Sequence, residues 1–256
     1  MKTGIIGYGY VGQAMGRLFP DAAIYDVATH PDPHALKGCN FILICVPTPM
    51  APDGSCDVRH VEAAAHAARE FAPDALVCIK SAVPPGTTDR LNEEHNTDVF
   101  TVSPEYIGEG KNFTPYWDYP HPQDPTMHDF VIVGGPRAGE VLDVFQTVMA
   151  TTARYMKCTA VEAELVKRVE NAFFATKVTF CNEIAAIAHA YGVDYHVLRE
   201  LWLLDPRVGR SHTAVFGGFG GKCLPKDISA LISESGVPTP LLSAVQEANV
   251  LYSAKD

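Results

Sequence analysis

The stretch Thr3-Gly-Ile-Ile-Gly7-Tyr-Gly9-Tyr-Val-Gly12 decides the fold of this chain. Its apolar start predicts a buried strand, and the GxGxxG pattern that follows predicts a tight turn opening into a helix. Gly7 permits the turn, Gly9 lets the backbone approach a phosphate, and Gly12 lets the helix pack closely on the strand. This order is typical of a βαβ unit that binds a dinucleotide.

An acidic residue at the expected distance indicates which dinucleotide binds. The predicted strand Ala23–Tyr25 leads into Asp26, about 20 residues after the first glycine of the motif. A carboxylate there accepts hydrogen bonds from the adenosine ribose hydroxyls and repels a 2′-phosphate. We therefore predict NAD rather than NADP as the cofactor, and we assign Tyr10 and Val11 of the turn to the same binding site.

The pattern along the rest of the chain predicts two domains. Strand-like runs and helical patterns alternate as far as residue 150, which predicts a parallel sheet covered on both faces. The strand-like runs are Thr3–Ile6, Ala23–Tyr25, Phe41–Val46, Leu76–Ile79, Val99–Val102 and Phe130–Val133, and the helices are Tyr10–Phe19, Val58–Phe71 and Gly139–Met149.

Beyond residue 158 the predicted elements are all helical. Residues Val161–Ala190 contain neither Gly nor Pro and predict one long helix, followed by shorter helices at Cys223–Ser235 and Pro240–Ser253. We therefore predict an α/β fold. A Rossmann-like doubly wound parallel sheet forms residues 1–158, and an all-α domain built on one long helix forms residues 159–256.

Composition excludes several classes of protein. The 256 residues carry a net charge of −10, which disfavours binding to nucleic acid. No apolar run reaches about 18 residues, so no membrane span is predicted. The seven cysteines contain no CxxC pair, which argues against a disulfide scaffold and a structural zinc site, and no metal is expected. The absence of a leader pattern at the start favours a cytoplasmic location.

A second motif carries the predicted chemistry. It reads Phe216-Gly-Gly-Phe-Gly-Gly-Lys-Cys223-Leu-Pro-Lys226-Asp227. The glycines form a loop whose backbone can press against a ligand, and Cys223 follows at the start of a helix. The helix dipole and the neighbouring lysines favour the thiolate, and Asp227 lies one turn further along on the same face. The arrangement predicts covalent catalysis by Cys223.

Five ordered segments resemble the UDP-glucose/GDP-mannose (nucleotide-sugar) 6-dehydrogenase family, and within it the UDP-glucose 6-dehydrogenases most. The segments are Val46-Pro-Thr48-Pro, Ser103-Pro-Glu105-Tyr-Ile-Gly-Glu109-Gly, the helical run from Leu165 to Glu183, Asp205-Pro-Arg207-Val-Gly209 and the cysteine segment itself. The resemblance implies oxidation of a primary alcohol to a carboxylate, with two hydrides passed to two NAD molecules. A thiohemiacetal and then a thioester form on the cysteine.

The resemblance also implies roles for individual residues. Cys223 is the nucleophile, Lys167 and Asn171 hold the oxyanion, and Asp227 positions water. Glu105 acts in acid–base or hydrolysis chemistry. The remaining assignments are Glu109 in the catalytic network and near the cofactor, Thr48 and Lys226 near the cofactor, and Arg207, Phe219 and Gly220 with Lys167 and Asn171 at the substrate. Arg207 reaches the neighbouring subunit's substrate in the family, which implies a homodimer.

Two departures from the family pattern bear on this assignment. Ala82 stands where the family has a threonine whose hydroxyl helps to hold the catalytic water. Ser81 is adjacent, but in an extended segment its side chain points to the opposite face. We therefore expect thioester hydrolysis either to be slow or to use other groups. The family also has a third domain that grips the nucleotide, and the resemblance does not extend to it. A partner chain, a smaller or weakly bound sugar, or closure of the site by the dimer partner remain three explanations.

Two other functions stay open at this point. One is a two-electron dehydrogenase of the 3-hydroxyacid type, which also uses a Lys followed four residues later by Asn but needs no cysteine. The other is a catalytically impaired NAD-binding relative that needs a partner chain. Retention of the cysteine segment favours a nucleotide-sugar dehydrogenase, with UDP-glucose as the leading substrate.

Overall fold

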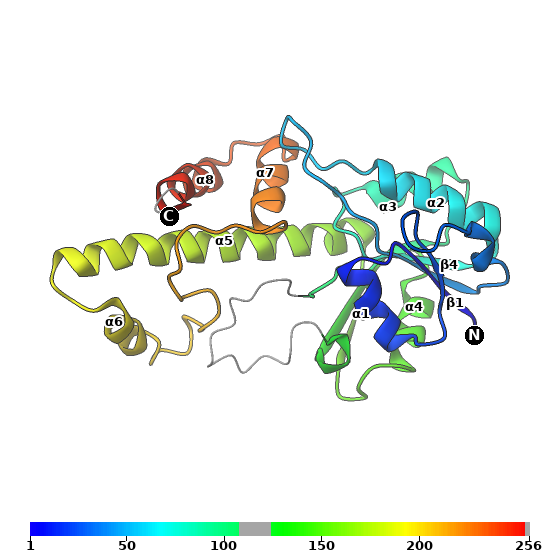
Figure 1. Cartoon of the computed structure of the whole chain (residues 1–256), viewed down its shortest axis with the longest axis horizontal. Coiled ribbons are helices and arrows are strands. Elements are labelled where there is room, and N and C mark those ends of the chain that lie inside the picture. Colours follow the sequence, from blue (N-terminus) through cyan, green and yellow to red (C-terminus); the bar gives the residue numbers. More distant parts are fainter. Residues whose placement is uncertain (108–123, 254–256) are drawn as a thin grey trace. The chain divides into compact units, whose positions relative to one another are not determined.

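The computed structural model describes residues 1–107 and 124–253 (Figure 1). These residues form two compact units. The first contains residues 1–49, 56–107 and 124–167, and the second contains residues 50–55 and 168–253. The long helix α5 (Ala160–Ala190) contributes residues to both units. The division at residue 158 that was expected from the sequence stays a prediction.

One mixed sheet forms the centre of the first unit. Within the described part of the chain it has seven strands in the order β2-β1-β3-β4-β5-β6-β7. Their bounds are β1 Thr3–Ile6, β2 Ala23–Tyr25, β3 Phe41–Ile44, β4 Leu76–Ile79, β5 Phe100–Val102, β6 Phe130–Gly134 and β7 Arg154–Cys158. Neighbouring strands are parallel except β5 and β6, which pair antiparallel at Val102 and Gly134. The predicted α/β class is confirmed, with this one antiparallel pair as a difference.

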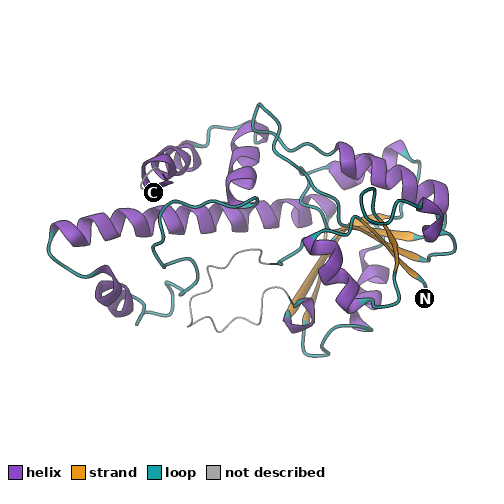
Figure 2. Cartoon of the chain, viewed as in Figure 1, coloured by secondary structure: helices purple, strands orange, loops and turns teal. Residues whose placement is uncertain are grey.

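Helices cover both faces of the sheet (Figure 2). One face packs against α1 (Tyr10–Leu18) and α4 (Ala138–Gln146), and the other packs against α2 (Arg59–Phe71) and α3 (Thr87–Glu94). Alternation along each strand explains this arrangement, because successive side chains point to opposite faces. The sheet is therefore doubly wound, as the sequence predicts.

The order of the strands fixes where a ligand can bind in this unit. The chain passes from β1 to β2 on one side and then returns to β3 on the other side of β1. In open α/β sheets such a switch point leaves a crevice at the carboxyl ends of the strands, where ligands bind. The glycine-rich turn follows β1 directly, and Val46-Pro-Thr48-Pro follows β3.

The second unit is helical. It contains residues 168–190 of α5, together with α6 (Tyr195–Trp202), α7 (Leu224–Glu234) and α8 (Pro240–Ser253). Buried residues from α5, α7, α8 and the glycine-rich loop form its core, namely Ala172, Ala175, Phe219, Ile228 and Val245. The all-α character expected of this part of the chain is confirmed.

Three regular elements were not predicted from the sequence, namely α3, α6 and β7. Two short 3₁₀ helices, Pro33–Leu36 and Pro125–Met127, were missed as well. Among the described residues, no helix combines the length and the apolar character that crossing a membrane requires.

Candidate active site

The glycine-rich turn after β1 has the geometry that a pyrophosphate needs. Gly7 has a φ of 87°, and a Cβ there would lie 2.8 Å from the carbonyl oxygen of Cys45. A Cβ on Gly12 would overlap the carbonyl oxygen of Gly7. Around Gly9, by contrast, no described atom lies within 4 Å of a Cβ position. The turn therefore has open space at the N-terminus of α1, where the free amides of the first helical turn can bind an anion.

Three predicted cofactor residues lie at this turn. Tyr10 is the first residue of α1 and is exposed, and Val11 follows it half-buried. The Asp26 carboxylate accepts hydrogen bonds from the Tyr8 amide at 2.8 Å and from the Thr29 amide and hydroxyl at 3.0 Å. These bonds, that from Tyr8 foremost, lower the pKa of Asp26. A fixed, ionised carboxylate beside an open phosphate cradle fits NAD.

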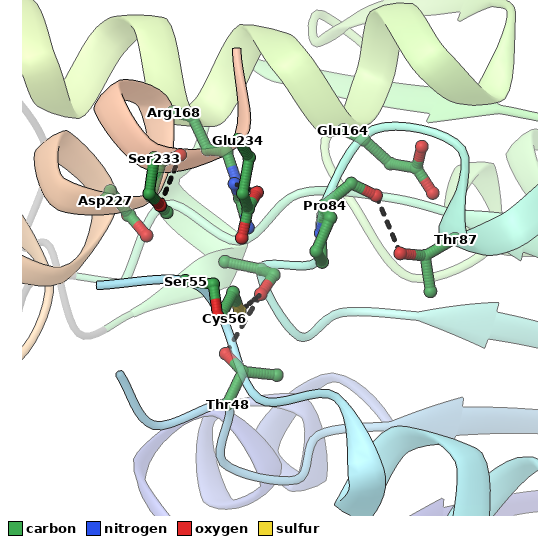
Figure 3. Close-up of polar contacts among 12 residues, drawn as sticks. Thr48, Ser55, Cys56, Pro84, Thr87, Glu164, Arg168, Asp227, Ser233 and Glu234 are labelled. Carbon is green, nitrogen blue, oxygen red and sulfur yellow. Dashed lines mark hydrogen bonds and ion pairs between the residues drawn. The ribbon is translucent and has the colours of Figure 1, made fainter. Parts of the chain in front are cut away.

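Polar side chains at the turn after β3 form hydrogen bonds to backbone oxygens within the protein. Thr48 donates from Oγ1 to the Ala82 carbonyl oxygen at 2.9 Å, and Cys56 donates to the same oxygen at 3.5 Å (Figure 3). Ser81 is buried and donates to the carbonyl oxygen of Val46 at 2.7 Å. The Ser81 hydroxyl therefore donates its proton within the turn, and the expectation that it does not replace the missing threonine stays a prediction.

A buried lysine holds the loop that carries Glu105. Lys80 follows β4, and its Nζ donates to Ser103 Oγ at 3.0 Å and to the Pro104 carbonyl oxygen at 3.2 Å. Burial lowers the pKa of Lys80. The Glu105 carboxylate accepts a hydrogen bond from the Ile107 amide at 2.6 Å. Lys80 was not singled out from the sequence, although a lysine directly after a buried strand was a visible signal.

One further predicted residue, Lys167, contacts this loop. The ammonium group of Lys167 lies 4.7 Å from the centre of the Tyr106 ring, a cation–π contact within the first unit. Glu109 lies outside the described residues. Lys167 and Asn171 are one turn apart on α5, as predicted.

In the second unit, the structure brings four predicted residues together at the start of α7. Cys223 is the N-cap of this helix, and its carbonyl oxygen accepts the Asp227 amide at 2.9 Å. Asn171 Nδ2 donates to Asp227 Oδ2 at 2.6 Å, and Lys226 Nζ donates to Asp227 Oδ1 at 2.6 Å. The Asp227 side chain is only 1% exposed. A buried, charge-paired carboxylate thus lies one helical turn from a thiol.

The contact between Lys226 and Asp227 was not expected, because the resemblance assigns Lys226 to the cofactor. The structure shows the Lys226 side chain 13% exposed, with its ammonium group paired with the neighbouring carboxylate. This pairing offsets the cost of burying the Asp227 charge, which would be several kcal/mol if it were unpaired.

The predicted substrate residues of the second unit have different surroundings. The Arg207 side chain is 88% exposed and pairs with Asp205 at 2.6 Å. The Phe219 side chain is buried in the core, whereas Gly220 is exposed. No group of three or more His, Cys, Asp or Glu residues among the described ones is arranged to hold a metal ion.

These features define a nucleotide-dependent α/β protein whose helical part carries a cysteine beside a buried carboxylate. Residues 25–121 match the model of the UDP-glucose/GDP-mannose dehydrogenase family, NAD binding domain, and residues 161–250 match the model of that family's central domain. The chain belongs to the UDP-glucose/GDP-mannose dehydrogenase family.

Individual relatives agree with this membership. A UDP-glucose 6-dehydrogenase of Pseudomonas aeruginosa is 32% identical over 84% of this chain and 49% of its own length. The chain spans about half the length of the curated relatives it matches. A UDP-glucose dehydrogenase structure from Pyrobaculum islandicum has a TM-score of 0.79 and 31% identity, covering 98% of this chain and 68% of that one. A UDP-D-ManNAc dehydrogenase structure from Pyrococcus horikoshii has a TM-score of 0.82 and 26% identity, with the same two coverages.

Proposed function

We propose that this protein catalyses the NAD-dependent, four-electron oxidation of the C6 primary alcohol of a nucleotide sugar, with UDP-glucose giving UDP-glucuronate. The observation that carries the proposal is the group formed by Cys223, Lys226, Asp227 and Asn171 at the start of α7. A two-electron dehydrogenase has no use for a thiol beside a buried carboxylate, whereas oxidation through to an acid has.

NAD supplies the hydride acceptor when it is bound. The turn from Gly7 to Gly12, including Gly9, Tyr10 and Val11, would hold its pyrophosphate, and Asp26 would hold the adenosine ribose. Thr48 shapes the turn after β3 through its hydrogen bond to Ala82 and would line the same site. Lys226 donates one of its three N–H groups to Asp227 and would direct another to the cofactor.

Covalent chemistry on Cys223 follows the first oxidation in this proposal. The thiolate adds to the carbonyl carbon of the aldehyde and forms a thiohemiacetal, whose oxygen carries the negative charge. Asn171 has two N–H donors and uses one on Asp227, so the other can donate to this oxygen. We assign Lys167 to the same oxygen. Loss of the second hydride to a second molecule of NAD, with the oxygen deprotonated, would leave a thioester.

Water then cleaves the thioester, releasing the carboxylic acid and regenerating the Cys223 thiolate. Asp227 would orient this water and accept its proton, and we assign Glu105 and Glu109 to proton transfer in the same steps. Ala82 has no hydroxyl, and the Ser81 hydroxyl donates to Val46. Hydrolysis would therefore have fewer groups to hold the water than in relatives that carry a threonine in place of Ala82. We therefore propose that hydrolysis is the slow step.

We also propose a homodimer in which Arg207 reaches the substrate of the neighbouring subunit. Large apolar side chains with 46–59% exposure repeat along one face of the second-unit part of α5, at Val169, Phe173, Phe180 and Ile187. Their near-heptad spacing is the pattern by which helices pair. Gly220 of the cysteine loop would face the sugar, whereas the Phe219 side chain is buried in the core and would support the loop from behind. The cytoplasmic location and the partner chain that would supply the third domain stay predictions.

A panel of substrates tests the proposal. The purified protein is incubated with NAD and UDP-glucose, UDP-N-acetylmannosamine, GDP-mannose or a 3-hydroxyacid, and the products are identified by mass spectrometry. Formation of a sugar acid that is lost in Cys223→Ser and kept in the control Cys158→Ser supports the proposal. Turnover of the 3-hydroxyacid that persists in Cys223→Ser contradicts it, as does NAD binding without turnover of any sugar in the panel.

A further inference from the structure

A helix far along the chain holds the loop in front of Cys223. Asn249, on α8, contacts both backbone groups of one loop residue: its Oδ1 accepts the Phe219 amide at 2.6 Å, and its Nδ2 donates to the Phe219 carbonyl oxygen at 2.9 Å. In an antiparallel sheet, a residue of one strand likewise exchanges both of its backbone hydrogen bonds with a residue of the neighbouring strand. A single side chain thus fixes the position and the orientation of the backbone at Phe219.

The surrounding contacts show that α8 and the loop fit closely together. The Gly218 amide donates to the carbonyl oxygen of Tyr252 at 3.2 Å. A Cβ on Gly218 would lie 2.7 Å from Asn249 Oδ1, so only glycine allows this approach. On the other side of the loop, Asn182 of α5 donates to the Gly217 carbonyl oxygen at 2.8 Å.

The side chain of Phe219 also connects the loop with α8. It is 5% exposed and packs in the core cluster that contains Val245 of α8 and Ile228 of α7. Cys223 follows four residues after Phe219, and α7 begins directly after it. The backbone that leads into the thiol is therefore anchored at Phe219 both by its side chain and by its peptide groups.

We propose that Asn249 is a positioning residue for Cys223. Through the two hydrogen bonds to Phe219 it holds the glycine-rich loop so that the thiol at the start of α7 meets the reacting carbon of the sugar. This inference rests on the proposed function, in which Cys223 is the nucleophile. It adds α8, which no motif connected with the chemistry, to the parts of the chain on which catalysis depends.

The test compares Asn249→Ala with a matched control on the same helix. Gln246 also carries a side-chain amide, but it donates to Ser229 on α7 rather than to the loop. Gln246→Ala therefore removes an amide contact of α8 and leaves Phe219 untouched. The first readout is hydrogen exchange of the Phe219 amide. We expect this amide to be protected in the wild type and in Gln246→Ala, and to exchange at least about tenfold faster in Asn249→Ala.

The second readout needs no substrate. At about pH 9.5 an ordinary thiol is largely ionised, so the rate of Cys223 alkylation by iodoacetamide reports access rather than ionisation. Loosening the loop should raise this rate about threefold or more in Asn249→Ala, relative to Cys158 in the same sample, and leave it unchanged in Gln246→Ala.

The third readout is turnover of the sugar. In Asn249→Ala we expect kcat to fall about tenfold or more with an unchanged KM for NAD, because the defect is one of orientation. Unchanged protection of the Phe219 amide would overturn the proposal. So would equal alkylation or turnover in Asn249→Ala and the wild type, or equal defects in the two variants. If the wild type oxidises no nucleotide sugar, the proposed function fails, and the exchange and alkylation rates still decide whether Asn249 positions Cys223.

Discussion

Arg168 and Glu234 form an ion pair whose two halves should contribute very unequally to stability. Arg168 lies on α5 and its side chain is 1% exposed, whereas Glu234, on α7, has a side chain that is 21% exposed (Figure 3). One guanidinium nitrogen of Arg168 bonds to Glu234, and within the described residues its Nε and Nη2 have no hydrogen-bond partner. Removing the Glu234 carboxylate therefore leaves the buried Arg168 cation without its charge partner, while removing Arg168 leaves a carboxylate that water can reach.

The expected magnitudes follow from this asymmetry. Glu234→Ala should lower the free energy of unfolding by about 3–5 kcal/mol, the usual cost of leaving a buried charge without its partner. Arg168→Met keeps the volume of the stem and removes two nitrogens that have no hydrogen-bond partner among the described residues, so its cost should be below about 1 kcal/mol. In the Arg168→Met background, Glu234→Ala should then cost less than about 1 kcal/mol.

Urea unfolding followed by circular dichroism measures all four proteins, with constant m-values confirming that the native and denatured states stay comparable. Equal losses in the two single variants, or a larger loss in Arg168→Met, would refute the reasoning.

Three further predictions follow from the site. Asp26→Asn should raise the KM for NAD by about tenfold or more and reduce the preference for NAD over NADP, because a charged acceptor for the ribose hydroxyls is lost. Initial rates with each cofactor measure this preference. If the variant and the wild type prefer NAD over NADP to the same degree, the assignment of Asp26 is wrong. Asn171→Ala should lower kcat by about a hundredfold, because the oxyanion loses a donor and the buried Asp227 loses its 2.6 Å hydrogen bond. Stopped-flow measurement of each oxidation step would reveal this loss, and unchanged rates would exclude a role of Asn171 in holding the oxyanion. Burial lowers the pKa of His95 and of His128 below the ordinary 6.5. Protonation therefore favours the unfolded chain, and the free energy of unfolding should fall as the pH drops from 7 towards 5.5. The double variant His95→Gln, His128→Gln should reduce this pH dependence in urea unfolding, and an unchanged pH dependence would assign it to other groups.

The strongly patterned parts of the fold could be predicted from the sequence. Strands such as Phe41–Ile44 are continuous apolar runs because both faces of the sheet are covered, and helix α5 lacks any Gly or Pro over 31 residues. β7 was missed because it lies at the edge of the sheet, where polar residues such as Arg154 and Lys157 replace an apolar run.

Short helices were missed because their sequence signals are weak. α3 buries a single large apolar residue, Leu91, and begins after Gly86 in a left-handed conformation. α6 has only eight residues, although the Asp194 side chain accepts the His196 amide, and an aspartate at that position was a visible N-cap signal.

The sequence located most of the candidate site but not what supports it. Glycines, Cys223 and Asp227 carry motifs with fixed local spacing, and local spacing can be read from a single sequence. The contacts of Lys80 with Ser103, of Arg168 with Glu234 and of Asn249 with Phe219 join residues 23, 66 and 30 positions apart. Such pairs become visible only after the helices and strands have packed, because no periodicity connects their members.

The most direct test of the central claim is the number of NADH molecules formed per molecule of UDP-glucose consumed, with NADH absorbance and mass spectrometry of the sugar followed in the same sample. The account predicts about two NADH per sugar acid in the wild type, with a thioester on Cys223 detectable in the intact protein after rapid quenching, because hydrolysis is proposed to be slow. It predicts no acid from Cys223→Ser. One NADH per sugar with an aldehyde or ketone as the final product, or acid formation that survives Cys223→Ser, would contradict a mechanism through this cysteine.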